Sequence, residues 1–592
     1  MYEALLKATP EYQKVAASFG SAGPAALFGL PPAGRALLYA ALQKDLGRVL
    51  CIVTPGEAEA THFADDLKAL GLTAAVFPPR DFMLRPVEGA GREYEYRRLA
   101  VLGDLVGGRL QAVCVPDEGL TQYTTPRAEF CANTRTLHPG DTLPRADLTA
   151  LLYGAGYTRR DQVDGPGQFS IRGDIVDIYA PDMKQPARLE FWGDEIDTMH
   201  SFDLATQRRD EPIEKIYVSP AREVLFGLPG EAAELIRAAI KKARGKRRTA
   251  LESCTASDLA QLDGGAMPVD MDKYLSLRYP EPATILDYFD DPLLILEEPA
   301  SLREAERATA YRRSEELSAL LEDGVLAPGL DKLYAESSWL WAQTSTHRTL
   351  CAENFARSMP DVPLKAIVNA PAHTLPIWGG EVAALLEDIQ PLCSGGAAVT
   401  IMAGTPRAAA GLAADLRTKG LNVTTDAEAD PSAGMVQILP GQLSAGCSLP
   451  FAKFALFTAR AFGVSGAQKK KKRSKDALNS LSEISVGDLV VHQNHGIGRY
   501  AGIQRMAVQG VTKDYLRIEY DKKDVLYVPV TQLDLLSRYT APGDSDNVKL
   551  SRLGGNDWAK TRKKVKAATE LMAKELIELY ARRKQAHGYA FP

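Results

Sequence analysis

Residues 49–77 read VLCIVTPGEAEATHFADDLKALGLTAAVF and predict the architecture of the first domain. An apolar strand is followed by a Thr-Pro turn that can cap a helix, by apolar residues at helical spacing, and by a second apolar strand after Gly71. A strand, a helix and a strand with an apolar first strand form the unit of a parallel sheet covered by helices. The stretch therefore predicts an α/β domain.

Residues 399–424 repeat this order as VTIMAGTPRAAAGLAADLRTKGLNVT. Both copies resemble pieces of helicase-type α/β domains. The alternative is a pair of unrelated strand-helix-strand units, and periodicity alone does not separate the two interpretations. We expect two α/β domains before residue 464.

The composition is typical of a soluble globular protein with several domains. The 592 residues are 45% hydrophobic and 24% charged, and this length corresponds to about four domains of ~150 residues each. The seven cysteines include no C-x-x-C pair, so neither a zinc ribbon nor a disulfide framework is indicated. We therefore expect a reducing, cytoplasmic location and no bound metal.

Neither export nor membrane insertion is expected. The N-terminal sequence lacks a basic-then-apolar signal pattern, and no stretch approaches about 18 consecutive apolar residues. The net charge is −5, but basic residues cluster at 469–475 and 558–584. We therefore expect any contact with nucleic acid to come from the C-terminal quarter.

No G-x-x-x-x-G-K-[ST] phosphate loop occurs in the chain. Such a loop holds the β and γ phosphates of a nucleotide through consecutive backbone N–H groups and a lysine. Residues 28–42, FGLPPAGRALLYAAL, stand in its place. Gly29 and Gly34 have loop-like spacing, but Arg35 and Ala36 stand where a lysine and a hydroxyl residue are required. An arginine can touch a phosphate, but the missing hydroxyl removes a magnesium ligand.

The matching acidic element lies in residues 285–299, ILDYFDDPLLILEEP. This apolar strand ends in Glu297 and Glu298, at the position of the metal-binding acid of a nucleotide site. Because the loop is degenerate, we expect structural roles for both carboxylates, no catalytic residue, and no bound ATP or magnesium. The alternative is a divergent helicase-like ATPase built on the degenerate loop.

Residues 156–209 have a sequence pattern that differs from that of the two α/β units. They alternate apolar and polar side chains and carry G-D and P-D turns. This period of two predicts an antiparallel sheet with one solvated face. Such a sheet has no place in a doubly wound α/β unit, so we expect an inserted domain.

The motifs of this insert carry a specific resemblance. GYxRxD, GxFSIRGDIVDIY, RLEFWGDEID and SFDLATQ resemble the excinuclease B protein, the damage-recognition component of excision repair, and the matching module of the bacterial transcription-repair coupling factor. In both, this sheet domain binds the excinuclease A protein. The resemblance implies that contact for five residues: Arg159, Arg172, Phe191, Phe202 and Asp203.

One motif departs from the family. The family's F-R-x-R-G arrangement is Phe169-Ser170-Ile171-Arg172-Gly173 here, so the first arginine is lost and a lower affinity is expected. The alternative for the whole set is that Phe191 and Phe202 are core residues and that the arginines are simply solvated.

The region before the insert distinguishes the two relatives. Residues 77–105 run almost directly into a helix and leave no room for the long Tyr-rich hairpin with which the excinuclease B protein wedges into DNA. The resemblance therefore favours the coupling factor, whose body has this degenerate form. We expect no damage recognition by this chain itself.

Residues 485–539 predict a small, strongly bent β barrel. Their short strands are broken by G-D, H-G, G-x-G and D-K-K turns. His492 and His495 lack further metal ligands, so a turn-stabilising role is expected. The string from VGDLVVH to LLSRY resembles the RNA-polymerase-interacting domain shared by the coupling factor and a family of transcription regulators.

The strand at 514–520 is predicted to contribute the polymerase contact. Its side chains alternate, so that one set fills the barrel while an exposed backbone edge pairs with a strand of the partner. By resemblance the partner is the β chain of RNA polymerase. The predicted contact residues are Tyr515, Leu516, Arg517 and Ile518. The alternative is an interior strand that is paired on both sides.

Residues 549–592 predict a helix from Asn556 to about Ala586. This tail resembles the connecting helix that leads into the double-stranded-DNA translocase of the coupling factor. We expect the motor to lie outside this chain, and ATP, magnesium and most contact with double-stranded DNA to be found only in the full-length protein.

We interpret the chain as the N-terminal portion of a coupling factor that binds stalled RNA polymerase and recruits the excinuclease A protein in transcription-coupled nucleotide excision repair. A stand-alone polymerase-binding regulator is a further alternative. The expected parts are a degenerate helicase-like (RecA-like) α/β domain at 1–119, the inserted sheet domain at 120–215, the remainder of the body at 216–345, a second α/β domain at 346–463, a basic linker at 464–484, a Tudor-like β barrel at 485–547 and a connecting helix at 548–592.

Overall fold

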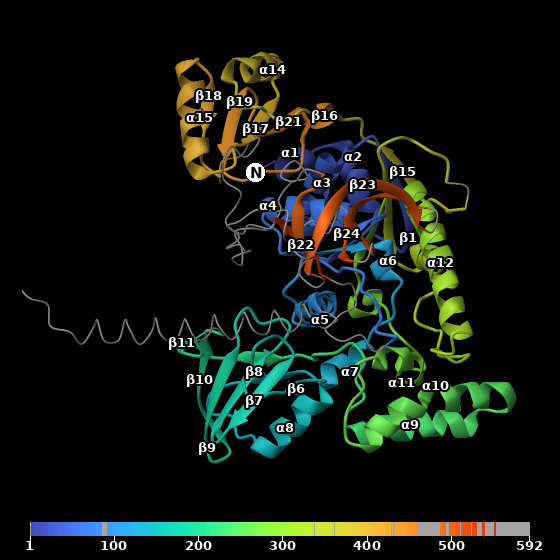
Figure 1. The fold of residues 1–592 in the computed structure, drawn as a ribbon. Helices are drawn as coiled ribbons and strands as arrows, with labels where there is room; N and C mark the ends of the chain where they lie inside the picture. The colour runs from blue at the N-terminus through green and yellow to red at the C-terminus, as the bar shows by residue number, and fades with distance from the viewer. Residues whose placement is uncertain are drawn as a thin grey trace, which may run out of the picture. The chain divides into compact units, whose positions relative to one another are not determined.

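Figure 1 shows the fold as a computed structural model. The structure describes residues 2–85, 92–204, 206–336, 338–359, 361–427, 429, 432–459, 486–492, 496–508, 511–521, 524–529, 536–538 and 550–551. The chain divides into two compact units, Met1–Phe462 and Gly463–Pro592. Of the described helices, none combines the length and the apolar character needed to cross a membrane.

The first domain is a parallel sheet of seven strands in the order β15-β1-β14-β13-β2-β4-β3. The strands are β1 (Gly23–Phe28), β2 (Leu50–Thr54), β3 (Ala74–Val76), β4 (Ala112–Pro116), β13 (Leu293–Glu297), β14 (Arg348–Glu353) and β15 (Ala366–Asn369). The helices of this domain are α1 (Glu3–Lys7), α2 (Pro10–Ser18), α3 (Pro32–Leu46), α4 (Glu57–Ala69), α5 (Glu93–Val106), α6 (Asp117–Leu120), α12 (Pro299–Glu322) and α13 (Trp339–Thr346).

Both faces of this sheet are buried. Ile52 of β2 packs into the core that α3 and α4 cover, whereas its neighbours Cys51 and Val53 pack into the core that includes α5 and α12. Parallel sheets are covered on both faces because their crossover connections place helices there. The α/β prediction for residues 49–77 is therefore confirmed.

The first domain extends further than expected. Strand β14 lies between β1 and β13, and β15 pairs with β1 at the sheet edge. The body therefore runs to Asn369, and the boundary expected at 345 is wrong. Pairing between segments more than 300 residues apart leaves no local signal in the sequence, which explains why the strands of this region were not predicted.

The second α/β domain contains a sheet in the order β16-β20-β21-β17-β19-β18. Its elements are β16 (His373–Leu375), α14 (Val382–Ser394), β17 (Ala398–Met402), α15 (Pro406–Thr418), β18 (Asn422–Thr424), β19 (Met435–Leu439), β20 (Gly446–Leu449), η3 (Pro450–Ala452) and β21 (Phe454–Thr458). Strand β20 runs antiparallel to both of its neighbours, whereas the pairs from β21 to β18 are parallel.

The internal repeat predicted from the sequence has the same topology in both copies. In the first copy, the strand β4 lies between β2 and β3, and in the second, β19 lies between β17 and β18. The Thr-Pro turns differ. Thr405 caps α15 by accepting a hydrogen bond from the backbone N–H of Ala408 at 3.2 Å, whereas the hydroxyl of Thr54 donates to the carbonyl of Gly56. The predicted cap is thus present only in the second copy.

The insert is a sheet of six strands in the order β11-β10-β9-β8-β7-β6. All neighbours are antiparallel except β6 and β7. Its elements are α7 (Arg127–Ala132), β5 (Arg135–Leu137), α8 (Arg145–Gly154), β6 (Thr158–Arg159), β7 (Gln168–Arg172), β8 (Ile175–Tyr179), β9 (Ala187–Trp192), β10 (Glu195–Phe202), β11 (Arg209–Pro212) and β12 (Ile216–Val218). Leu148 and Leu152 of α8 pack on the inner face, together with Leu189 and Phe191, and the predicted alternation is confirmed.

The boundary of the insert lies beyond residue 215. Strand β12 pairs with β5, so the two ends of the insert form a two-stranded ribbon. After this ribbon the chain enters a helical region made of α9 (Pro229–Lys242), α10 (Gly245–Asp263), η1 (Met271–Tyr274), α11 (Leu275–Arg278) and η2 (Ile285–Tyr288). Helices α9 and α10 form a hairpin that packs on Tyr274 and Leu320 through Ile236 and Leu251.

The second unit contains an antiparallel sheet in the order β25-β24-β23-β22-β26. Its strands are β22 (Leu489–His492), β23 (Gly496–Val508), β24 (Val511–Glu519), β25 (Val525–Pro529) and β26 (Leu536–Arg538). Leu516, Ile518 and Tyr520 are buried, whereas Arg517 and Glu519 are half-buried. The predicted alternation is confirmed, and closure into a Tudor-like barrel stays a prediction.

Strand β24 is not an edge. It pairs with β23 on one side and with β25 on the other, so the exposed backbone edge predicted at 514–520 is wrong. The alternation of side chains was correct because burial imposes it, but alternation is the same for interior and edge strands. The predicted linker at 464–484, His495 and the helix from Asn556 lie outside the described residues.

Candidate functional site

The degenerate nucleotide site is filled by an internal ion pair. Arg35 of α3 lies with its Nε 3.2 Å from Oε2 of Glu297 and donates from Nη1 to Oε1 of Glu298 at 2.7 Å. The side chains of Arg35 and Glu297 are each only 2% exposed. The hydroxyl of Tyr39 donates to the other oxygen of Glu297 at 2.5 Å. Three residues that were predicted to share the degenerate site, Arg35, Glu297 and Glu298, thus lie in contact with one another.

Burial dominates the chemistry of Glu297. Loss of hydration raises the pKa of its carboxyl to about 7, although the charge of Arg35 acts in the opposite direction. Oε1 of this carboxylate accepts from Tyr39, whereas Oε2 lies at ion-pair distance from Arg35 and makes no hydrogen bond.

The connection between β1 and α3 does not have the form of a phosphate loop. Only Gly29, Leu30 and Pro31 lie between the two elements. Pro31 and Pro32 have no backbone N–H, so this turn lacks the run of donors that cradles a phosphate. Gly34 lies inside α3, and its expected place in a glycine loop is wrong, because a helix starting at Pro32 includes it.

Gly29 has a structural role at this turn. Its φ of +91° is in the region that favours glycine, and a Cβ there would lie 3.1 Å from the carbonyl oxygen of Ala370. The glycine therefore permits the close approach of the segment that follows β15.

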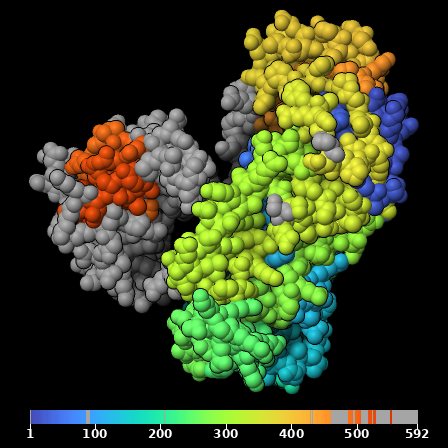
Figure 2. All heavy atoms as spheres, turned by 90° about the vertical axis from the view of Figure 1, so that its right-hand side faces the viewer, coloured from blue at the N-terminus to red at the C-terminus, as the bar shows by residue number. Residues whose placement is uncertain are grey.

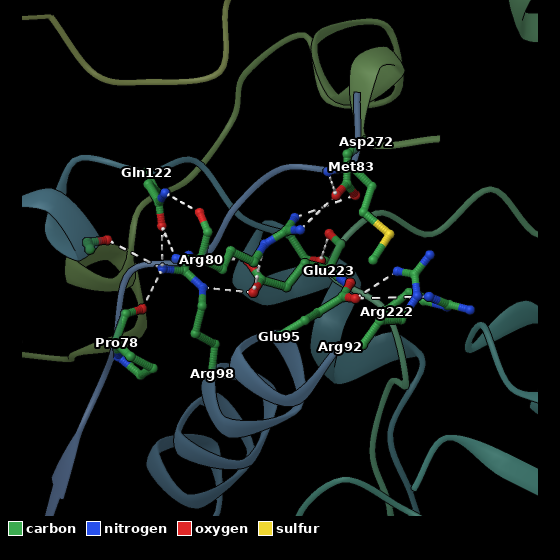
Figure 3. A network of polar contacts seen from close by, with 12 residues as sticks. Pro78, Arg80, Met83, Arg92, Glu95, Arg98, Gln122, Arg222, Glu223 and Asp272 are labelled. Atoms are coloured by element: carbon green, nitrogen blue, oxygen red, sulfur yellow. Dashed lines mark hydrogen bonds and ion pairs between the residues drawn. The ribbon is translucent and has the colours of Figure 1, made fainter. Parts of the chain in front are cut away.

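A buried network of charges joins the insert to the body (Figure 3). Glu223, shortly after β12, accepts a hydrogen bond from Nε of Arg98 at 2.7 Å and lies 3.2 Å from Nε of Arg80. Arg80 also donates to Asp272 at 2.6 Å. Glu95 accepts from the backbone N–H of Glu223 at 2.9 Å. Because these groups are buried and mutually paired, they fix where the chain leaves the insert.

The outer face of the inserted sheet carries a second charged cluster. Asp177 of β8 is fully buried between two arginines, accepting from Arg172 at 2.5 Å and from Nε of Arg188 at 2.7 Å. The guanidinium of Arg188 lies 4.6 Å from the ring centre of Phe202, while Arg172 is 44% exposed. Asp177 thus orients one exposed and one shielded arginine.

Trp192 lies on the same face and was not among the predicted contact residues. It ends β9, where Leu189 and Phe191 point into the core and alternate residues point outward. Its side chain is 84% exposed, more than any other large apolar residue among those described. The alternation in RLEFW was the signal that could have identified it.

The five residues predicted to bind the excinuclease A protein fall into two groups. Arg159 and Arg172 are exposed, on the adjacent strands β6 and β7. Phe191 and Phe202 are buried, so their expected surface contact is wrong and the alternative of a packing role is correct. Asp203 accepts hydrogen bonds from the backbone and hydroxyl of Thr206 at 2.8 and 2.9 Å, which orders the turn after β10.

Among the described strands of the second unit, β25 lies at one end of the sheet. Within the described residues, β25 pairs only with β24. The N–H of Tyr520 donates to the carbonyl of Asp524 at 2.8 Å. Because hydrogen-bonded pairs alternate along an antiparallel ladder, the N–H groups of Val525 and Tyr527 point away from β24. Among the described residues, no group of three or more potential metal ligands is found.

Two family models match the sheets described above. Residues 136–224 match the UvrB interaction domain, and residues 484–540 match the CarD-like/TRCF RID domain. The first match covers the inserted sheet and its ribbon, and the second covers the five-stranded sheet.

Comparison of the whole chain with curated proteins gives relatives that are all described as transcription-repair-coupling factors. The chain is 30% identical over 582 residues to the transcription-repair-coupling factor of Bacillus subtilis (strain 168), covering 95% of this chain and 49% of the relative. It is 26% identical over 605 residues to that of Staphylococcus aureus (strain MRSA252), covering 99% and 51%. The chain spans about half the length of these curated relatives. The resemblance stated from the sequence motifs is confirmed.

Proposed function

We propose that this chain acts in transcription-coupled nucleotide excision repair as a bridge, binding stalled RNA polymerase through its second unit and the excinuclease A protein through the inserted sheet. The observation that carries the proposal is the placement of the two family matches on two separate sheets. Each sheet has a feature suited to a partner, one an exposed face and the other an exposed edge.

The outer face of the insert is suited to a protein partner. Interface energy concentrates in a few aromatic and arginine side chains, and Trp192 and Arg172 supply one of each. Arg172 is held by Asp177, so less side-chain freedom is lost on binding. In this proposal Phe191 supports the face from the core beneath the sheet, and Phe202 packs against Arg188.

The edge of the second unit is suited to strand addition. A partner strand can pair with the outward N–H and C=O groups of β25, while side chains on the sheet supply specificity. The buried Leu516 and Ile518 of β24 would support this edge from inside rather than touch the polymerase. The β chain of the polymerase remains our proposed partner.

ATP-driven translocation on double-stranded DNA belongs, in this proposal, to the complete protein and to a segment outside this chain. The Arg35–Glu297 pair and the prolines after β1 argue against a divergent ATPase in the first domain. We propose no ATP, magnesium or other cofactor for this chain. The presence of the large first unit also argues against a stand-alone regulator, because such a regulator needs only the second unit.

A bridging experiment tests the proposal. RNA polymerase is immobilised, the chain is added, and retention of the excinuclease A protein is measured. We expect retention only when the chain is present. A Trp192→Ala variant should still bind polymerase but fail to retain the repair protein, whereas Tyr527→Pro should lose both. Retention that is independent of the chain, or insensitive to both substitutions, contradicts the bridge.

A further inference from the structure

We propose that the turn between α9 and α10 binds the phosphate backbone of double-stranded DNA. Residues 241–248 read KKARGKRR and contain no acidic residue. We call the basic side chains of this turn the basic tip; they are Lys241, Lys242, Arg244, Lys246, Arg247 and Arg248, and all are exposed. The inference goes beyond the proposed function, and either can fail without the other.

The charge of the basic tip is not neutralised within the described structure. Arg248 pairs with Glu252 at 2.8 Å. Among the described residues, no acidic group forms an ion pair with the remaining five cations. A chain with a net charge of −5 therefore concentrates positive charge at one turn. Such a concentration attracts polyanions over a Debye length, about 10 Å at 0.1 M salt.

The six cations do not share one role in the hairpin. Lys241 and Lys242 lie in the last turn of α9, where the helix dipole favours positive charge. Lys246, Arg247 and Arg248 lie in the first turn of α10, which contains no acidic residue. Positive side chains are unfavourable there because the helix dipole is positive at its N-terminus. The packing contacts of the hairpin lie in the core around Ile236 and Leu251, and Arg237 pairs with Asp263 at 2.6 Å.

The hairpin projects from the body. Helices α9 and α10 lie side by side and extend outward in Figure 1, and the same green surface forms a lobe at the lower end of Figure 2. A projecting turn of two helices can approach a cylindrical duplex without collision of the body. The placement therefore suits contact with a large, extended polyanion.

The composition of the tip favours duplex DNA over other partners. No large apolar side chain is exposed between Pro229 and Asp263. Protein interfaces usually include an aromatic or apolar anchor, and single-stranded nucleic acid is held by aromatic stacking. Clustered lysine and arginine without such anchors suits the sequence-independent contact of a duplex backbone. The sequence had predicted contact with nucleic acid in the C-terminal quarter. The proposed contact at the basic tip lies outside that quarter.

The test compares two triple variants of the full chain. The first, K241Q/K242Q/K246Q, removes three charges from the tip. The matched control, K14Q/K332Q/K419Q, removes three exposed lysines from other surfaces of the first unit. Binding to a random-sequence duplex of about 30 base pairs is measured by fluorescence anisotropy over a range of salt concentrations.

We expect the tip variant to bind at least about tenfold more weakly than the control near 50 mM salt. The slope of log K against log salt concentration should become less negative by about 2–3, because each lost phosphate contact removes close to one released counterion. Acetylation footprinting of the wild type should show protection of Lys241, Lys242 and Lys246 by DNA. Equal affinity and slope for both variants would overturn the inference.

A second polyanion distinguishes an acidic protein from DNA. The same variants are titrated with polyglutamate of matched charge. If the tip variant loses affinity for polyglutamate but keeps its affinity for the duplex, the surface belongs to an acidic protein and the DNA inference is wrong. If the tip variant loses affinity for the duplex only, or loses more affinity for the duplex than for polyglutamate, the DNA inference is supported.

Discussion

Arg35 and Glu297 are far apart in the chain, yet Nε of one lies 3.2 Å from Oε2 of the other in a pair that is almost completely buried. In a nucleotide site the corresponding positions face phosphate and metal. Here the protein's own cation meets the protein's own acid, so the charges that would otherwise act on a ligand are satisfied internally.

The first prediction concerns ATP turnover. We expect no phosphate release above background from the purified chain, with or without DNA, because the turn after β1 lacks consecutive N–H donors. Arg35→Lys should not create activity, since a lysine does not replace those donors. Steady-state phosphate release is the measurement. Turnover that disappears in Arg35→Ala would instead support the divergent ATPase.

The second prediction concerns pH. The pKa of Glu297 is raised to about 7 in the folded protein from an ordinary value of 4.5, because burial outweighs attraction by Arg35. The folded state therefore binds this proton more tightly than the unfolded state. Its contribution to stability is complete below pH 4.5 and is lost as the pH rises to 7, by at most on the order of 3 kcal/mol.

Glu297→Gln isolates this contribution. Other buried acids also have a raised pKa, Asp117 among them, so the wild type and the variant are compared by urea unfolding at pH 5 and pH 7.5. The wild type should lose more stability between the two pH values than the variant does. Parallel losses would mean that Glu297 stays ionised throughout.

The third prediction concerns the outer face of the insert. Trp192→Ala should weaken binding to the excinuclease A protein by about 2 kcal/mol, roughly 30-fold, because it removes an exposed aromatic anchor. Arg172→Ala should cost about 1 kcal/mol, since that arginine is half exposed. Calorimetry with the full partner is the measurement. Tyr311→Ala, which removes another exposed aromatic side chain, is the control and should have no effect.

The fourth prediction concerns the polymerase edge. Tyr527→Pro should abolish capture by RNA polymerase, because it removes an N–H that points away from β24. Tyr527→Ala keeps that N–H and should bind, which separates backbone pairing from loss of the side chain. Leu526→Pro removes a donor directed at β24 and should also destabilise the sheet. Pull-down and thermal unfolding of the full chain are compared. Normal capture by Tyr527→Pro would exclude pairing through β25.

The periodicity of the sequence predicted which side chains of a strand are buried. The inward set of Leu516, Ile518 and Tyr520 was identified because alternate residues of a strand share one face. The same pattern does not reveal how many neighbours a strand has, so β24 was assigned to an edge that belongs to β25. The degenerate site at Arg35 was found because residues 28–42 occupy the place of a phosphate loop without matching its motif. The position of Gly34 within α3 could not be predicted in the same way, because it depends on where the helix begins.

Pairing between strands that are far apart in the sequence was the other feature that could not be predicted. The place of β14 between β1 and β13 joins segments whose order in the chain gives no hint of adjacency. For Trp192 the information was present, since the pattern that buried Phe191 also exposed its neighbour. It was not predicted as a contact residue because the resemblance assigned the contact to Phe191 and Phe202.

The ribbon and the network around Glu223 have a consequence for moving the insert between homologues. A segment cut at residue 215 loses β12 and leaves β5 without its partner, whereas Glu223 stays with Arg98 in the body. A longer segment that includes Glu223 takes this acid away and leaves the guanidinium of Arg98 buried without it, at a cost of about 3–5 kcal/mol. A transplant therefore needs β12 on the moved segment and an acid at position 223 in the product.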